Sequence, residues 1–322
     1  MIKTQTHRIN NNDVTINLHS IGEGPLILCV HGWPELWYSW RHQMEHFAER
    51  GYKVAAMDVR GYGHSDKPHE IEHYTMKLMT ADVAKCIDAL GDGHAILFGH
   101  DWGAPIVWNT SILFPQKVRA VAGLSVPHLP VGEKSLLELS KERFKDQFFY
   151  QHYFLPEGIA EAEFEADVAK ALRMTYFSSS GDSPVLGGIG AKRPLGAKFL
   201  DELIDPEEFP NWLTQEDLNV YVRAFEKSGF RGPFNRYRAQ QIDFEELPQL
   251  QGALVNQPSY FIGGGSDSIR NLLPGRDLYE TPGYGCTDFK GSTIIPNVGH
   301  WVQQEAPQQT NQALEIFLEL LG

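Results

Sequence analysis

Four short apolar runs in the first half of the chain constrain its fold more than any other feature. They span Pro25–Val30, Lys53–Asp58, Ala95–Phe98 and Val118–Leu124. The runs are mostly continuous rather than alternating, which is typical of parallel strands covered by helices on both faces. Between the second and third runs, Thr80–Leu90 has apolar residues at helical spacing, and Gly91 marks an expected helix end. We therefore predict an α/β fold with a mostly parallel central sheet flanked by helices.

The middle of the chain has a different composition. From residue 129 to 245, Lys, Glu, Phe and Tyr recur at spacings typical of helices. Helices are expected at Ser135–His152, Glu161–Arg173 and Thr214–Ser228. This segment is predicted to be a helical cap inserted into the α/β fold.

The pattern of the first part of the chain returns after the insert. Apolar runs occur at Pro258–Gly263 and Ser292–Pro296, and an amphipathic helix is expected at Thr310–Leu321. The predicted organisation is a core formed by residues 1–128 and 246–322, with the cap at 129–245 between its two parts.

Net charge and the length of the apolar runs argue against nucleic-acid and membrane partners. The chain has 322 residues, with 28 Lys and Arg against 41 Asp and Glu, and a formal net charge of −13. This charge does not favour a nucleic-acid partner, which requires a basic surface. No apolar run approaches the roughly 18 residues that span a bilayer, and no apolar signal segment opens the chain. We expect a cytoplasmic protein, a monomer or a homodimer, with no nucleic-acid or membrane partner.

Metal and cofactor motifs are not evident in the sequence. The three widely spaced cysteines suggest neither a disulfide framework nor a metal site. Neither an HExxH pattern nor a glycine-rich nucleotide loop between a strand and a helix is found. We therefore expect chemistry that needs no cofactor and no metal.

The segment Gly99–Gly103 follows an apolar run and precedes a stretch that reads as a helix start. A strand, a turn with glycine on both sides of one reactive residue, and a helix form the layout of a nucleophile elbow. The residue at the centre is Asp101. A carboxylate that attacks a saturated carbon forms an alkyl ester, which predicts displacement or ring opening rather than ordinary ester cleavage.

Two further residues follow predicted strands in the order expected of a catalytic triad. The nucleophile candidate Asp101 is followed by Asp267 and then by His300. Nucleophile, acid and histidine occur in this order in proteins with a nucleophile elbow. A histidine can take a proton from water near neutral pH, and a carboxylate fixes its tautomer and stabilises the imidazolium. The alternative for each residue taken singly is an ordinary polar loop position.

The loop after the first apolar run contains His31-Gly32-Trp33-Pro34. A loop in this place supplies half of an oxyanion hole, so the backbone N–H groups of Trp33 and Trp102 are candidate donors. Pro34 is compatible with a preceding cis peptide bond. The alternative is a tight turn with an aromatic ring packed below it.

The motifs together resemble those of epoxide hydrolases of the α/β-hydrolase fold. His31–Glu35 matches HGWPE, Arg60–Asp66 matches RGYGxSD, Gly99–Gly103 matches the nucleophile motif and Gly299–Trp301 matches GHW. The resemblance covers nearly the whole chain. It implies an α/β-hydrolase fold with a helical cap and a small-molecule epoxide as substrate.

The resemblance also implies two cap tyrosines that hydrogen-bond the epoxide oxygen. The flanking segments place them at Tyr150 and Tyr237, and Tyr153, on the same helix face as Tyr150, is the rival for the first position. The alternative is that these tyrosines belong to the core. The residues expected to bind substrate are Trp33, Pro34, Trp102, Tyr150 and Tyr237.

The sequence therefore predicts an epoxide hydrolase that forms vicinal diols through an ester on Asp101, which water activated by His300 and Asp267 then hydrolyses. One alternative is a haloalkane dehalogenase with the same nucleophile. That family commonly has Asn after the HG pair, where this chain has Trp33. Another alternative is a non-catalytic binding protein on the same fold. A serine esterase is disfavoured because the elbow has no Ser.

Overall fold

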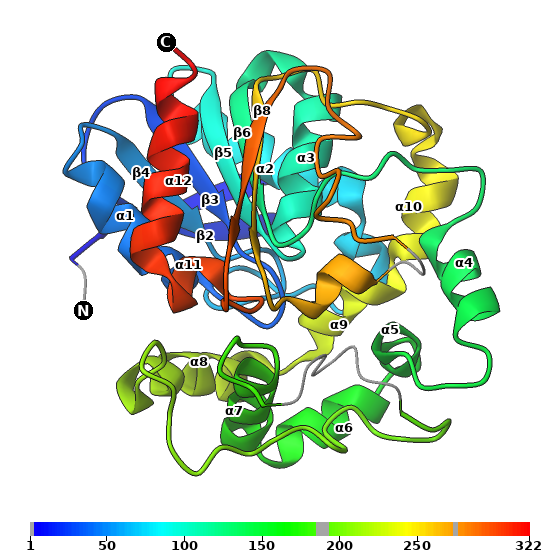
Figure 1. The fold of residues 1–322 in the computed structure, drawn as a ribbon. Coiled ribbons are helices and arrows are strands. Elements are labelled where there is room, and N and C mark those ends of the chain that lie inside the picture. The colour runs from blue at the N-terminus through cyan, green and yellow to red at the C-terminus, as the bar shows by residue number, and fades with distance from the viewer. Residues whose placement is uncertain (1–2, 185–192, 273–275) are drawn as a thin grey trace.

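The computed structural model describes residues 3–184, 193–272 and 276–322 (Figure 1). Its centre is one eight-stranded sheet with the strand order β1-β2-β4-β3-β5-β6-β7-β8. From β4 to β8 in this order, all neighbouring strands are parallel, whereas β1 and β2 pair in the antiparallel direction. The strands are β1 (Gln5–Asn11), β2 (Val14–Ile21), β3 (Leu26–Val30), β4 (Lys53–Met57), β5 (Ala95–His100), β6 (Val118–Leu124), β7 (Ser259–Gly264) and β8 (Phe289–Ile295). The predicted mostly parallel sheet is confirmed.

The hairpin formed by β1 and β2 was not predicted. All side chains of β1 are exposed or half-buried, and the strand contains no apolar run. In β2, Val14, Ile16 and Leu18 are buried at alternate positions, which is the period-2 signal of a strand with one buried face. That alternation is present in the sequence and could have identified the second strand.

Helices cover both faces of the sheet (Figure 1). Helices α1 (Arg41–Ala48) and α12 (Pro307–Glu319) lie on one face, and α2 (Met76–Leu90) and α3 (Gly103–Leu113) lie on the other. Alternate strand residues face opposite ways. In β3, Ile27 and Cys29 belong to the apolar cluster under α1 and α12, and Leu28 and Val30 to the cluster under α2 and α3. Burying an aliphatic side chain of this kind stabilises the fold by about 1.5–3 kcal/mol.

Among the residues that the structure describes, seven α-helices lie between β6 and β7 in the chain. They are α4 (Leu136–Arg143), α5 (Tyr150–Phe154), α6 (Ile159–Ala166), α7 (Val168–Ser178), α8 (Gln215–Ser228), α9 (Arg231–Arg238) and α10 (Gln240–Glu246). In Figure 1, α6, α7 and α8 lie together beyond one end of the sheet. The short helix α11 (Val302–Glu305) precedes α12. Among the described residues, no helix has the length and apolar character needed to span a membrane.

Two of the three helices predicted in this region are wrong as continuous helices. The stretch from Ser135 to His152 divides into α4 and α5, because the chain turns so that the rings of Phe144 and Phe149 stack with centroids 4.1 Å apart. The stretch from Glu161 to Arg173 breaks at Asp167, whose φ is −155° and whose carboxylate caps α7 by accepting the Lys170 N–H. The third prediction is confirmed by α8, which Thr214 caps.

Candidate active site

Asp101 lies in a sharp turn between β5 and α3. Its φ is +48°, a conformation that non-glycine residues rarely adopt. The glycines on either side leave no room for a side chain. A Cβ on Gly99 would lie 2.3 Å from the Gly103 carbonyl oxygen, and one on Gly103 would lie 2.0 Å from the Val30 carbonyl oxygen. The turn therefore needs both glycines, and it presents Asp101 at the carboxyl end of the sheet, where open α/β sheets bind ligands.

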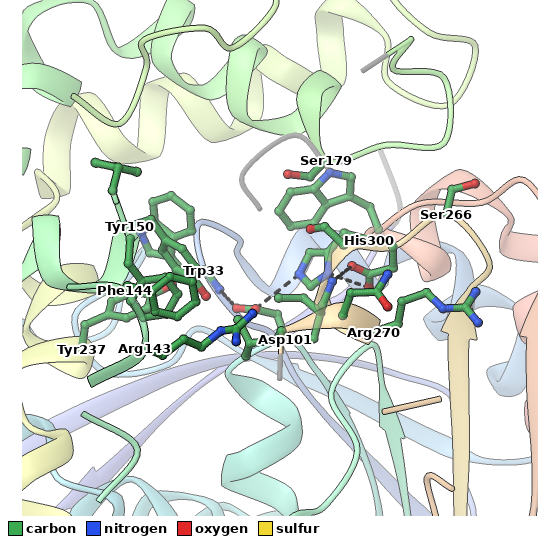
Figure 2. A pocket seen from close by; sticks show the side chains of 18 of the residues that line it. Trp33, Asp101, Arg143, Phe144, Tyr150, Ser179, Tyr237, Ser266, Arg270 and His300 are labelled. Carbon is green, nitrogen blue, oxygen red and sulfur yellow. Dashed lines mark hydrogen bonds and ion pairs between the residues drawn. The ribbon is translucent and has the colours of Figure 1, made fainter. Parts of the chain in front are cut away.

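The structure brings Asp267 and His300 to Asp101 (Figure 2). The His300 imidazole lies between the two carboxylates, with Nε2 3.3 Å from Asp101 Oδ2 and Nδ1 2.9 Å from Asp267 Oδ2. Asp267 follows β7, and its carboxylate also accepts the Ile269 N–H at 2.9 Å. The hydroxyl oxygen of Tyr279, which sequence reasoning did not single out, lies 2.7 Å from Asp267 Oδ2. These contacts hold the acid and orient the histidine.

The charges of these three residues are coupled. Burial by itself would lower the pKa of His300, but Asp267 and Asp101 outweigh burial and raise this pKa well above that of an exposed histidine. Burial would raise the pKa of Asp267, but His300, the Ile269 N–H and the Tyr279 hydroxyl lower it below its ordinary value. The site therefore favours an imidazolium between two carboxylates when Asp101 carries its charge.

The loop after β3 reaches the same carboxylate. The backbone N–H of Trp33 donates to Asp101 Oδ1 at 2.7 Å, and the Trp33–Pro34 peptide bond is cis. A Cβ on Gly32 would lie 2.4 Å from the Cβ of Asp101, so the close approach requires glycine. Trp102 directly follows Asp101 at the start of α3, where the backbone N–H groups of a helix have no partner within the helix.

A cavity of about 480 Å³ opens above Asp101. Trp33, His300, Tyr150 and Tyr237 are among the residues that line it. The rings of the two tyrosines have centroids 6.1 Å apart. In Figure 2 the tyrosines lie on one side of Asp101 and His300 on the other. An electrophile in the cavity would therefore meet a carboxylate, two phenols and an imidazole.

Three of the predicted residues are placed differently. Tyr153, the rival of Tyr150, does not line the cavity, and burial together with the nearby Glu163 carboxylate raises the pKa of its hydroxyl. Pro34 and Trp102, expected to bind substrate, are also not among the lining residues. The rings of Trp102 and Tyr237 meet edge to face with centroids 5.3 Å apart. Trp102 therefore supports Tyr237.

Both cavity tyrosines are held in the protonated form. Burial raises the pKa of Tyr150 and that of Tyr237, and the nearby Asp101 charge raises both further. Each phenol therefore keeps its hydrogen at neutral pH and can donate it to an oxygen in the cavity.

A buried pair of Glu35 and His100 supports the site, and sequence reasoning missed its role. Glu35 Oε2 lies 2.7 Å from His100 Nδ1 and accepts the Gly32 N–H at 3.0 Å. The other ring nitrogen of His100 lies 2.8 Å from the backbone oxygen of His300. The pair thus connects the loop after β3, the elbow and the His300 loop. The sequence feature that could have identified this pair is Glu35 itself, a carboxylate inside the HGWPE motif and next to the candidate residues Trp33 and Pro34.

Glu305 joins the His300 loop to the end of α7 and was also missed. Its buried carboxylate accepts the backbone N–H groups of Gly181, Gly299 and Trp301, each at 2.8 Å. Burial raises the pKa of Glu305 to about 7, although these three donors act in the opposite direction. The backbone N–H of His300 donates to the Ser179 oxygen at 2.8 Å. Contacts from α11 and from the segment after α7 therefore hold the backbone of the loop that carries His300.

Within the ranges that the structure describes, no group of three or more His, Cys, Asp or Glu side chains could hold a metal ion.

Comparisons with known proteins identify the family of the chain. Residues 25–307 match the family model of the alpha/beta hydrolase fold. Epoxide hydrolase A of Mycobacterium tuberculosis is 37% identical over 314 residues, which cover 96% of each chain. Epoxide hydrolase B of the same organism is 34% identical over 353 residues, which cover 98% of each chain.

Solved structures lead to the same family. An epoxide hydrolase from an endophytic Streptomyces superimposes with a TM-score of 0.93 at 39% identity, covering 99% of this chain and 96% of that chain. Epoxide Hydrolase A from Mycobacterium thermoresistibile has a TM-score of 0.90 at 37% identity, covering 98% of each chain. Because relatives this similar match almost the whole length, the chain belongs to the epoxide hydrolases of the α/β-hydrolase fold family.

Proposed function

We propose that the protein opens small-molecule epoxides by covalent catalysis on Asp101. A carboxylate oxygen of Asp101 bonds to one ring carbon while the bond from that carbon to the epoxide oxygen breaks. Tyr150 and Tyr237 hydrogen-bond this oxygen, and one of them transfers its proton to the developing alkoxide. The product is a hydroxyalkyl ester on Asp101, and the His300 imidazolium then restores the proton that the tyrosine lost.

Water completes the reaction in the second step. Neutral His300, oriented by Asp267, takes a proton from water as the water oxygen adds to the carbonyl carbon of the ester. The backbone N–H groups of Trp33 and Trp102 stabilise the oxyanion. The intermediate collapses to the Asp101 carboxylate, and its hydroxyl proton passes to the departing alkoxide. The released product is a vicinal diol, and His300 is again protonated.

The observation that carries this proposal is the arrangement of the cavity around Asp101. Two protonated phenols lie across from the His300 imidazole (Figure 2). A phenol can therefore assist departure of the epoxide oxygen on one side, while His300 activates water on the other. Halide displacement has no use for such phenols. We further propose that the helices within residues 129–245 act as a cap that brings both tyrosines to the core.

The proposal is tested by trapping the ester. His300→Gln should open the ring but fail to hydrolyse the ester, because glutamine cannot accept a proton from water. We expect incubation with styrene oxide to raise the intact mass of the variant by the whole mass of the epoxide, and peptide mapping to place the adduct on Asp101. Wild-type protein, as the control, should show turnover and no lasting adduct.

A parallel incubation with 1-chlorobutane separates the alternatives. An adduct from the chloride alone, lighter than the reagent by hydrogen chloride, would identify a dehalogenase. No adduct from either reagent, together with no wild-type turnover on a panel of epoxides, would identify a non-catalytic protein. Either result would contradict the proposal.

The two chemical steps are expected to differ in pH dependence. Esterification removes the charge of Asp101, which is one of the causes that raise the pKa of His300, so this pKa falls in the ester. Hydrolysis needs neutral His300 and should slow about tenfold for each pH unit below that lowered pKa. Ring opening should change little over the same range. Rapid-quench mass spectrometry should show more ester at pH about 5.5 than at pH about 8.

The opposite result would contradict this assignment of roles. If ring opening slowed on acidification while ester hydrolysis stayed constant, His300 would not be the base of the second step.

Location in the cytoplasm, the monomeric or homodimeric state and independence of cofactors stay predictions from the sequence.

A further inference from the structure

The phenol oxygen of Tyr150 accepts a hydrogen bond from its neighbour in the chain. Gln151 Nε2 donates to it at 3.0 Å, and Gln151 is buried, with 6% of its surface exposed. The other end of the same amide, Oε1, accepts from Gln240 Nε2 at 3.2 Å. Gln240 Nε2 also donates to the backbone oxygen of Tyr237 at 3.0 Å. A chain of hydrogen bonds therefore runs from one cavity tyrosine to the other.

The backbone oxygen of Tyr237 fixes which atom donates and which accepts in each of these hydrogen bonds. A backbone carbonyl can only accept, so the atom of Gln240 that faces it must be the amide nitrogen. The same nitrogen faces Gln151, which must therefore present its oxygen to Gln240. The nitrogen of Gln151 then faces Tyr150 and donates. Neither amide can be turned around without placing two donors or two acceptors against each other.

This polarity determines what Tyr150 can do. Its oxygen already accepts an N–H, and within the described ranges no acceptor is found for its hydroxyl hydrogen. The hydrogen is therefore available to a ligand oxygen in the cavity. The N–H of Gln151 also stabilises the negative charge that forms on the phenol oxygen when the proton leaves, and it lowers the pKa of Tyr150 against the larger effect of burial.

We infer that Gln151, oriented by Gln240, is a positioning residue that directs the Tyr150 hydroxyl toward the epoxide oxygen and promotes its proton transfer. The inference rests on the proposed function, because it assigns Tyr150 to the ring-opening step. Tyr237 has a different neighbour, the indole ring of Trp102, which meets its ring edge to face. Gln240 meets Tyr237 only at its backbone oxygen, so the pair Gln151–Gln240 acts on the phenol of Tyr150 alone.

The test measures ring opening and ester hydrolysis separately, in single turnovers with styrene oxide. Gln151→Leu removes the donor and keeps the side chain near its original size. We expect ring opening to slow roughly tenfold or more, as for loss of a hydrogen bond to a group that becomes charged. Ester hydrolysis should stay at the wild-type rate. Gln240→Leu should slow ring opening less, because the Gln151 amide remains but is no longer oriented.

Two comparisons separate positioning from a general structural effect. Gln241→Leu, on the same helix as Gln240 and without contact to either tyrosine, is the matched control and should leave both steps unchanged. In the Tyr150→Phe background, adding Gln151→Leu should slow ring opening no further, because its effect passes through the phenol oxygen. Circular dichroism verifies folding of every variant. If Gln151→Leu does not fold, the rates of the two steps in Gln240→Leu are compared with those of the wild-type protein instead.

The outcomes distinguish this inference from the proposed function. Unchanged ring opening in Tyr150→Phe would show that Tyr150 is not the acid and would refute its role in the proposed function. Slow ring opening in Tyr150→Phe together with a wild-type rate in Gln151→Leu would refute the inference alone. Equal slowing by Gln151→Leu in both backgrounds, or equal slowing of both chemical steps, would show that Gln151 acts only on the structure.

Discussion

Asp101→Asn is expected to abolish epoxide turnover, with a fall in kcat/KM of roughly 10⁴-fold or more, as found when a nucleophile is removed. A neutral amide is a far weaker nucleophile than a carboxylate. Asn is the appropriate replacement because it tolerates the positive φ at this position better than most residues. Its side-chain oxygen can also keep the hydrogen bond from the Trp33 N–H, so the elbow should stay folded.

The measurement is steady-state hydrolysis of styrene oxide, combined with intact mass. The variant should show neither turnover nor an adduct. Asp92→Asn, the same change at an exposed residue outside the cavity, serves as the control and should keep full activity. Retention of more than about a tenth of wild-type kcat/KM by Asp101→Asn would mean that the reaction does not pass through this carboxylate.

Removal of both cavity phenols is expected to abolish ring opening. General acid catalysis contributes typically 10²–10⁴-fold, and the epoxide oxygen would otherwise leave as an unassisted alkoxide. Each single change, Tyr150→Phe or Tyr237→Phe, should slow ring opening by about 10²-fold, because the other phenol remains. Phenylalanine preserves the ring packing of Tyr237 against Trp33 and Trp102, so the cavity should keep its shape.

The experiment follows formation of the ester in a single turnover with styrene oxide. Tyr153→Phe is the matched control, since Tyr153 neighbours Tyr150 in α5 but does not line the cavity, and it should leave the rate unchanged. A fully active double variant would refute the role of both tyrosines. Loss of activity in Tyr153→Phe would instead show that the wrong tyrosine of α5 was chosen.

Sequence reasoning was strongest where structure depends on neighbouring residues. The apolar runs became β3 to β8, because continuous apolar segments can be buried on both faces of a parallel sheet. The order of Asp101, Asp267 and His300 along the chain, each after a strand, was enough to expect them at one edge of the sheet. The structure places them there, with His300 within hydrogen-bonding distance of both carboxylates.

Sequence reasoning was weakest where distant parts of the chain compete with local preference. The helix expected from Ser135 to His152 has suitable residues throughout, yet it breaks because stacking of Phe144 on Phe149 requires a turn. The hairpin of β1 and β2 was missed because strand β1, lying at the sheet edge, buries little apolar surface.

The sequence by itself determined the central sheet, the elbow and the residue types of the candidate site, because each depends on a short segment. Only the tertiary structure decided that Tyr150 rather than Tyr153 enters the cavity and that Glu35 pairs with His100. It also decided that Gln151 meets Gln240, 89 residues further along the chain. Buried polar groups must find partners wherever the fold brings them, and a linear pattern does not contain those distances.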